Sequence, residues 1–314
     1  MLRDRGACLA KARDFFASRG ILEVDTPLLQ RFSPVDEYIE VFCVEMDEAV
    51  TGFLHTSPEY AMKRLLCEGI GDIYQLGHVF RKGECGALHH PEFTMAEWYR
   101  VGADYHTFIQ ETADFITLFL GKLQLEVLPY REALKRYANI DYLWATEAEI
   151  RQALRAHGVA LHGEESSWKK KELLHALLSF IVEPQLGRNG LTVLYEYPPC
   201  EAALAHTLQK EEEMVAERFE IYYKGVELAN GYHELGDPLE LRRRFKEANV
   251  ARIEKGKKPL PIDELFLKAL ERGFPCCCGV AVGFDRLMLL RLSATHLQEV
   301  LPFVWESTNL SWDL

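Results

Sequence analysis

The chain has 314 residues, of which 48% are hydrophobic, and a net charge of −12. This composition supports a large core, while the negative charge disfavours extensive nucleic-acid binding, because binding to phosphate backbones requires a basic face. No apolar run is long enough for a membrane helix, and the charged start MLRDRGACLAKARDFF does not resemble a secretory signal, so we expect a cytoplasmic protein with no membrane partner.

The first part of the chain is predicted from helical spacing and from glycine and proline positions. Residues 2–19 are expected to form an amphipathic helix that Gly20 ends, and residues 21–27 a short strand that Pro27 ends. The elements expected next are a helix over 58–68, strands over 73–80 and 93–100, and a helix over 105–121.

The second part begins with a mostly helical stretch over 129–185. It is followed by strands over 191–198 and 219–235, a helix over 238–255, and a strand that runs into a helix over 279–292. Strands gather at both ends with helices between them, which favours an α+β fold with a largely antiparallel sheet over a doubly wound parallel one. Since no break in composition occurs, we expect a single domain over 1–314 with a helical insertion near 129–185.

Eight cysteines are present, three of them at 276–278. None forms the C-x-x-C pairs that are typical of a zinc site, so free thiols are expected.

A first group of candidate site residues surrounds the predicted strand end at Arg81, followed by His89, His90, Phe93 and Glu97. An arginine at a strand end can direct its planar donors at a phosphate, and an aromatic ring on the next strand can stack on a base. Taken alone, a surface salt bridge and a core phenylalanine are the preferred interpretation. The adjacent histidines are assigned to a loop rather than to a metal site.

A second group is Glu227 and Glu234, which flank Asn230-Gly231. On an unbroken strand, residues seven apart face opposite sides, so the prediction places a bulge at Asn230-Gly231 that brings the carboxylates together. Two converging carboxylates suit Mg²⁺ together with substrate phosphates. The alternative is two solvated glutamates.

The third group lies in GVAVGFDR, where Asp285 and Arg286 interrupt an apolar run. Burying an arginine is costly unless it is paired, so one interpretation is an internal Asp285–Arg286 pair. The other is that Arg286 clamps an anionic ligand, while Gly279 and Gly283 let the backbone approach it.

In this order, the three groups resemble the motifs of the class II aminoacyl-tRNA synthetase catalytic domain. RGILEVDTP (19–27) resembles motif 1, FRKGECGALHHPEFTMAEW (80–98) motif 2, and GVAVGFDR (279–286) motif 3. The likeness covers essentially the whole chain and is closest to the lysyl enzymes. It extends to their short paralogues, which attach β-lysine to a lysine side chain of elongation factor P. The segment TSPEY and Ala281, found where lysyl-tRNA synthetases typically carry glycine, are similar to those paralogues.

The resemblance implies an ATP-dependent ligase that forms an aminoacyl-adenylate, and it implies a role for each matching residue. The implied catalytic residues are Arg81, Glu227 and Arg286, with Mg²⁺ held by Glu227 and Glu234. The implied ATP-binding residues are Arg81, Lys82, Gly83, His90, Phe93, Glu227, Leu228, Gly283 and Arg286. The implied amino-acid pocket consists of Ser57, Pro58, Glu59, Glu97, Tyr99, Asn230, Glu234 and Ala281.

One departure from the family pattern follows Arg81, where Lys82-Gly83 replace Asn-Glu and Glu84 stands one place later; His90 also replaces a usual asparagine. By resemblance, the expected partners are elongation factor P, (R)-β-lysine or lysine, and a second copy in a homodimer formed through motif 1. Neither tRNA binding nor an anticodon-binding domain is expected. The alternatives are a tRNA-charging enzyme, a non-catalytic regulatory paralogue, and an enzyme that makes a free amide.

Overall fold

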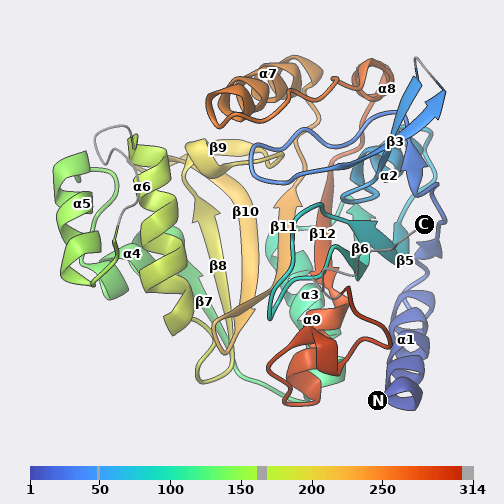
Figure 1. Cartoon of the computed structure of the whole chain (residues 1–314), viewed down its shortest axis with the longest axis horizontal. Helices are drawn as coiled ribbons and strands as arrows, with labels where there is room; N and C mark the ends of the chain where they lie inside the picture. Colours follow the sequence, from blue (N-terminus) through green and yellow to red (C-terminus); the bar gives the residue numbers. More distant parts are fainter. Residues whose placement is uncertain (48–49, 161–167, 306–314) are drawn as a thin grey trace, which may run out of the picture.

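A computed structural model describes residues 1–47, 50–160 and 168–305. Within them, a nine-stranded sheet has the order β1-β5-β6-β12-β11-β10-β8-β7, with β9 beside β10 (Figure 1). All neighbours are antiparallel except β1–β5 and β7–β8 at the two edges. The expected α+β fold with a largely antiparallel sheet is therefore confirmed. Its strands are β1 (Leu22–Glu23), β5 (Ile73–Phe80), β6 (Glu92–Val101), β7 (Leu125–Pro129), β8 (Leu191–Tyr197), β9 (Thr207–Lys210), β10 (Glu213–Tyr223), β11 (Val226–His233) and β12 (Cys277–Gly283).

One face of this sheet carries the main hydrophobic core. Helices α1 (Leu2–Ala17), α3 (Tyr105–Leu120) and α9 (Phe284–Arg291) pack against it (Figure 1). The Phe16 ring stacks on Tyr74 with centroids 4.1 Å apart and meets Trp98 edge-on. Because side chains alternate along a strand, filling this face with aromatic residues leaves the opposite face for polar side chains.

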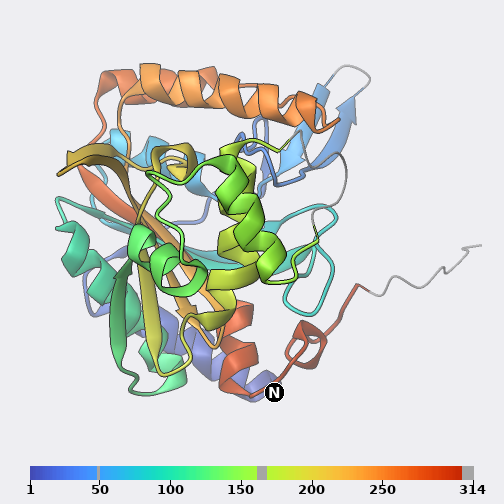
Figure 2. The same cartoon turned by 90° about the vertical axis from the view of Figure 1, so that its left-hand side faces the viewer.

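Two smaller clusters flank the sheet. Helices α4 (Tyr130–Ala138), α5 (Glu147–Ala156) and α6 (Lys170–Leu177) lie beside β7 and β8 and enclose Tyr130, Leu154 and Leu177 (Figure 2). They fall within the predicted insertion, which continues through short turns at Leu178–Val182 and Glu183–Gln185. On the other side, α2 (Glu59–Cys67), α7 (Pro238–Glu254) and α8 (Glu264–Arg272) share a cluster around Tyr60 and Phe266. The single-domain assignment stays a prediction.

Several short elements were not predicted. The strands β2 (Leu29–Gln30), β3 (Phe42–Asp47) and β4 (Val50–Leu54) form a second, three-stranded sheet. Single helical turns lie at Pro199–Glu201 and Leu297–Glu299. The strand predicted over 21–27 is reduced to Leu22–Glu23.

The prediction for residues 219–235 was wrong about the number of strands and about the position of the bulge. It is part of a hairpin of β10 and β11, which turns at Lys224 and Gly225 with φ of 52° and 74°. Two left-handed residues in a row match the twist of a two-residue hairpin. The bulge lies at Leu228, because Ile221 pairs with Ala229 while Tyr222 pairs with Glu227.

Asn230-Gly231 itself is regularly paired and forms neither a turn nor a bulge. Gly231 is needed there because a Cβ would come within 2.4 Å of the Phe219 ring on the neighbouring strand. The Asn-Gly signal thus reflects a close approach between strands.

Candidate active site

The polar face of the sheet carries a row of four register partners from four adjacent strands. Glu97 of β6 lies opposite Ala281 of β12, which pairs with Asn230 of β11, which pairs with Glu220 of β10. Side chains of register partners point to the same face, so these four lie side by side. The row marks the floor of the candidate site, and two groups of charged residues lie along it.

The first group lines a pocket that we call the arginine pocket. It holds nine residues predicted from sequence, namely Arg81, His90, Phe93, Glu227, Leu228, Asn230, Ala281, Gly283 and Arg286. Three further lining residues were named from the sequence, namely His89 and Asp285 in the candidate groups and Glu84 as a displaced family residue. The remaining ones are Leu88, Met95 and Leu297. Residues distant in sequence therefore meet, as the three-motif resemblance implied.

Arg286 enters the pocket from the first turn of α9. Its Nη1 donates to the backbone oxygen of Glu227 at 2.9 Å and lies 3.3 Å from the Glu227 carboxylate. Its other nitrogens contact the Leu88 carbonyl at 3.3 Å and His89 Nε2 at 3.0 Å. The guanidinium therefore bridges the motif 2 loop and β11.

The interpretation that Asp285 neutralises Arg286 is wrong. Asp285 is buried and binds Arg5 of α1, with Arg5 Nη1 2.5 Å from its Oδ1. Its second oxygen accepts from the Thr94 N–H at 2.8 Å, and Arg5 Nη2 also donates to the Thr94 hydroxyl. Consecutive residues at a helix start point in different directions, so Asp285 turns to the core while Arg286 turns to the pocket.

Arg81 stands directly after β5, and its guanidinium carbon lies 5.1 Å from the centre of the Phe93 ring. Its Nη1 is 3.9 Å from Glu84. Among the described residues, its buried Nε has no hydrogen-bond partner. A buried donor without an acceptor is costly, so this nitrogen marks a place for an anionic ligand.

The start of the motif 2 loop departs from the prediction. Lys82 and Gly83 are exposed and lie outside the residues that line the arginine pocket, whereas Glu84 lies within them. Gly83 has φ of 81°, so the glycine serves the turn. His90 Nδ1 is hydrogen-bonded to the Glu92 carbonyl, and its Nε2 accepts from the Trp305 backbone N–H. A direct role of Lys82 and Gly83 in ATP binding stays a prediction.

The second group, which we call the acid cluster, lies beside the row and is buried except for the half-buried Ser57 and Glu59. Its members are Ser57, Glu59, Lys63, Glu97, Tyr99 and Glu234. The hydroxyls of Ser57 and Tyr99 each donate to Glu97 at 2.7 Å. The Lys63 ammonium lies 2.5 Å from Glu59 and 2.6 Å from Glu234. Pro58 is buried at the N-terminal cap of α2, which carries Glu59 and Lys63.

Sequence reasoning missed Lys63, although its side chain is only 1% exposed and joins two predicted residues. The available signal was its position four residues after Glu59 on a predicted helix, which places both on one face. Burial opposes its charge, but the two carboxylates raise the pKa of Lys63 above its usual range. It is therefore a permanent cation inside the cluster.

Burial is also the main influence on Glu97. It raises the pKa of Glu97 to about 8, and the nearby charge of Glu59 adds to the effect, while the hydroxyls of Ser57 and Tyr99 oppose it. Without a ligand, Glu97 is therefore protonated over much of the neutral range. A cation placed beside it would favour the carboxylate.

Gly279 shows how tightly the acid cluster is packed. A Cβ at this position would meet Glu234 Oε1 at 2.3 Å and the Tyr99 ring at 2.4 Å. Its glycine is thus required by neighbouring side chains. Gly283 has only ordinary contacts with Arg286, so the protein alone does not require a glycine there.

Glu220 is the other residue that sequence reasoning missed. It accepts from Asn230 Nδ2 at 3.1 Å, from the hydroxyls of Tyr197 and Tyr222, and from Arg218 at 2.5 Å. These contacts orient Asn230, whose Oδ1 is buried and without a partner among the described residues. Arg218 and Tyr222 flank Glu220 on the same face of β10, but Tyr197 and Asn230 come from two neighbouring strands, which the local pattern does not show.

Glu227 and Glu234 belong to different groups. Burial and the charge of Glu220 raise the pKa of Glu227, which faces Arg286 in the arginine pocket. Glu234 already pairs with Lys63 in the acid cluster. The structure therefore supports Glu227 more strongly than Glu234 as a Mg²⁺ ligand, and the paired role stays a prediction.

Comparison with known proteins places this geometry in context. Residues 1–307 match the family described as tRNA synthetases class II (D, K and N). Three curated relatives are each named elongation factor P–(R)-β-lysine ligase. The Haemophilus ducreyi protein is 44% identical over 96% of this chain and 93% of its own length. Those of Edwardsiella ictaluri and Vibrio vulnificus are 42% and 41% identical, each over 96% of this chain and 94% of their own length.

Proposed function

The chain belongs to the class II tRNA synthetases (D, K and N), and from this premise we propose a specific ligase activity. It activates (R)-β-lysine, or lysine, as an acyl-adenylate at the expense of ATP, and transfers the acyl group to a lysine side chain of elongation factor P. The relatives' name supports this reaction, since they match nearly the whole chain. The observation that carries it is the arginine pocket beside the acid cluster, because one suits a triphosphate and the other an amino-acid ammonium group.

In the first step, a carboxylate oxygen of the donor attacks the α-phosphorus of ATP, and pyrophosphate leaves. The nucleophile belongs to the donor, so the protein needs to position the reactants and stabilise charge. Arg81 brings its unpartnered Nε and Arg286 its guanidinium to the same pocket. Fixed donors at these positions stabilise the charge that develops on phosphoryl oxygens. Phe93 offers its ring face to the adenine.

The residues present also fit a divalent cation. The Glu227 side chain is 37% exposed, and its partial burial together with repulsion from the Glu220 carboxylate raises its pKa. Mg²⁺ bound by Glu227 and the phosphates of ATP would relieve that repulsion and would neutralise the phosphate oxygens. Glu227 is thus the principal protein ligand in this proposal.

The donor's amino groups are assigned to the acid cluster. Glu97 lies next to Ala281 in the row, and Glu59 and Glu234 are held by Lys63. An ammonium group that contacts Glu97 favours its ionised form, so donor binding near neutral pH releases a proton. In the second step, the neutral amine of the acceptor lysine attacks the acyl carbon, an amide forms, and AMP leaves.

The remaining partners follow from the same premise. Exposed apolar side chains lie within the motif 1 segment, at Leu22, and directly after it, at Leu28 and Leu29, which supports a homodimer formed there. Among the described residues, no helix is long and apolar enough to cross a membrane. We place the protein in the cytoplasm, with elongation factor P rather than tRNA as its acceptor.

The test has two parts. ATP–pyrophosphate exchange should depend on (R)-β-lysine and be faster than with α-lysine. After incubation with ATP and donor, mass spectrometry should find the added mass on a lysine of elongation factor P. A preference for α-lysine would overturn the donor assignment, a label on tRNA alone would overturn the acceptor, and absence of exchange with any amino acid would favour a regulatory paralogue.

A further inference from the structure

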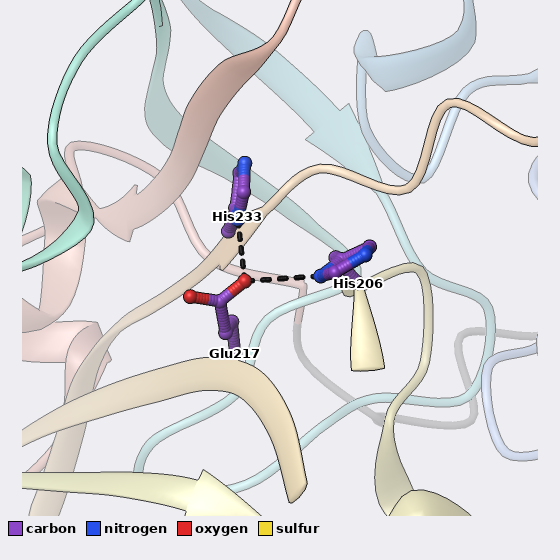
Figure 3. Close-up of side chains that lie close together, drawn as sticks. All are labelled: His206, Glu217 and His233. Atoms are coloured by element: carbon purple, nitrogen blue, oxygen red, sulfur yellow. Dashed lines mark hydrogen bonds and ion pairs between the residues drawn. The ribbon is translucent and has the colours of Figure 1, made fainter. Parts of the chain in front are cut away.

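A group of metal-ligating side chains lies apart from the residues of both the arginine pocket and the acid cluster. His206, Glu217 and His233 each offer a ligand atom that lies within 4.8 Å of the other two (Figure 3). Glu217 Oε2 is between the two rings, 3.1 Å from His206 and 2.5 Å from His233. We propose that these three residues form a binding site for a divalent transition-metal ion, for which Zn²⁺ is the natural probe.

The backbone holds the three residues together without a metal. His206 directly precedes β9, Glu217 lies on β10 and His233 ends β11. The His206 N–H donates to the His233 carbonyl at 2.8 Å, and the Glu217 N–H donates to the His206 carbonyl at 2.9 Å. The β10–β11 pairing of Arg218 with Tyr232 places Glu217 and His233 next to each other across the strands. Rigid strands are the support that a metal site requires.

The two distances from Glu217 to the histidine nitrogens suit zinc after a small adjustment, and the histidine donors lie within 4.8 Å of each other. Zinc binds imidazole nitrogen and carboxylate oxygen at about 2.0–2.2 Å, which places neighbouring ligand atoms about 3.3 Å apart in a tetrahedron. The His206 contact is already near that spacing, and the His233 contact must open by less than about 1 Å. Two imidazoles favour zinc or another transition metal over Mg²⁺ or Ca²⁺, which take oxygen ligands.

The charge balance also leaves room for a cation. Within the described parts of the chain, no lysine or arginine forms an ion pair with Glu217, whose charged partners are the two histidines. A metal ion would replace the protons shared in these two hydrogen bonds and release them to solvent. The His206 side chain is 46% exposed, so the fourth position is open to water.

Cys276 contacts the cluster but is assigned a different role. Its Sγ lies 3.3 Å from Nε2 of His233, whereas Nδ1 of that ring faces Glu217. The two nitrogens of one imidazole point away from each other, and Figure 3 shows Nε2 on the side of the ring away from the carboxylate. Cys276 therefore accepts the second ring proton and orients the ligand, as outer partners of metal-bound histidines do.

A bound metal would link the segment before β9 to β10 and β11, two strands of the candidate active site. Glu217 directly precedes Arg218, which binds Glu220, and His233 directly precedes Glu234 of the acid cluster. The predicted role is therefore structural. This inference does not depend on the proposed ligase activity, because metal binding is measured without ATP or donor.

The experiment uses the full chain, stripped with a chelator and titrated with Zn²⁺ against a chromophoric chelator of known affinity. One equivalent should bind and raise the melting temperature. His206→Ala, and independently Glu217→Gln, should weaken that affinity more than about 100-fold, beyond the loss typical of an outer partner. His157→Ala is the control, because His157 is exposed and its Nδ1 is hydrogen-bonded to the Ala153 backbone carbonyl. Circular dichroism should show that each variant is folded.

The absorption spectrum of bound Co²⁺ distinguishes whether Cys276 coordinates the metal or only contacts the ligand His233. The Co²⁺-loaded protein should show the visible absorption of a four-coordinate ion without a thiolate charge-transfer band, and Cys276→Ser should weaken binding by about 10-fold or less. A thiolate band that disappears in Cys276→Ser would overturn the ligand set. No Zn²⁺ binding by the unaltered protein, or equal affinity in His206→Ala, would overturn the site, since exposed cysteines would then account for any uptake.

Discussion

The two halves of the candidate active site hold their charges in opposite ways. In the acid cluster, Lys63 lies between Glu59 and Glu234, and Glu97 accepts from two hydroxyls, so the polar contacts come from the protein itself, while burial and Glu59 still raise the pKa of Glu97. In the arginine pocket, and among the residues that the structure describes, Arg81 has an unpartnered Nε, and the carboxylate of Glu227 at 3.3 Å is the one acid paired with Arg286. The comparison suggests that one half is prebuilt for a small ammonium donor, while the other depends on a polyanion to complete it.

The most severe test of this contrast is Lys63→Met. It removes the cation but leaves Glu59 and Glu234 in place, and breaking a buried ion pair from one side costs about 3–5 kcal/mol. We expect urea denaturation to show a loss of that size in the free energy of unfolding. Lys135→Met is the matched control, because Lys135 pairs with acids at the surface and should change stability little. Equal effects in the two variants would mean that the acid cluster is not prebuilt.

Arg286→Ala tests the other half. We expect it to lower ATP–pyrophosphate exchange by about 10²–10³-fold, the loss typical of removing one charge-stabilising donor, while the protein stays folded. Arg291→Ala on the same helix is the control, since Arg291 binds Asp4 and the Phe119 carbonyl instead of lining the pocket. Full exchange activity in Arg286→Ala would remove this residue from the phosphate clamp.

Glu97→Gln tests the acid cluster through the pH dependence of the protein's stability. Glu97 has a pKa of about 8 in the folded protein against 4.5 ordinarily, so between these values the folded state holds a proton that the unfolded state has lost. Its contribution to stability therefore falls as pH rises from about 4.5 to about 8 and is constant above that range.

Replacing Glu97 with glutamine removes this titration. The stability of Glu97→Gln measured by urea unfolding should decline less with pH than that of the unaltered protein, and the variant should bind the donor more weakly. Parallel pH curves for the two proteins would show that Glu97 does not titrate in this window. Donor-dependent proton release, followed by calorimetry in buffers of different ionisation enthalpy, should be reduced in the variant.

The smallest effect is expected from Ala281→Gly, which removes one methyl group from the row between Glu97 and Asn230. One methyl group discriminates between substrates by about 1–3 kcal/mol, and we expect the low end because the site floor is shared by several residues. The ratio of exchange rates with β- and α-lysine should shift toward α-lysine by about 5–10-fold. An unchanged ratio would locate donor choice elsewhere in the acid cluster.

The same contrast explains what could be predicted from sequence. Arg81, Phe93 and Arg286 stand at strand ends or helix starts, where local pattern and motif order agree, and the structure brings them together. The pairing of Lys63 with Glu234 and of Glu220 with Tyr197 depends on tertiary packing, which a single sequence does not show, although the spacing of Glu59 and Lys63 was visible. The alternative that pairs Asp285 with Arg286 failed for the same reason, because the partner of Asp285 lies 280 residues away.

The bulge in β11 shows a second limit of prediction from sequence. Asn-Gly is a strong local signal for a turn, yet Gly231 is required by the Phe219 ring of the adjacent strand, and the extra residue is Leu228. A local rule thus identified an unusual position correctly but assigned it the wrong geometry. Only the strand register determines which way Glu227 and Glu234 face.

The contact between Arg5 and Asp285 has a consequence for the order of events during synthesis. The ribosome makes Arg5 early and Asp285 280 residues later, and chain elongation proceeds at about 5–20 residues per second. The helix that presents Arg286 cannot be fixed against α1 until that interval has passed. For at least about 14 s, even at the fastest elongation rate, the nascent chain therefore carries an unfinished nucleotide site, and ATP can assist only the last stage of folding.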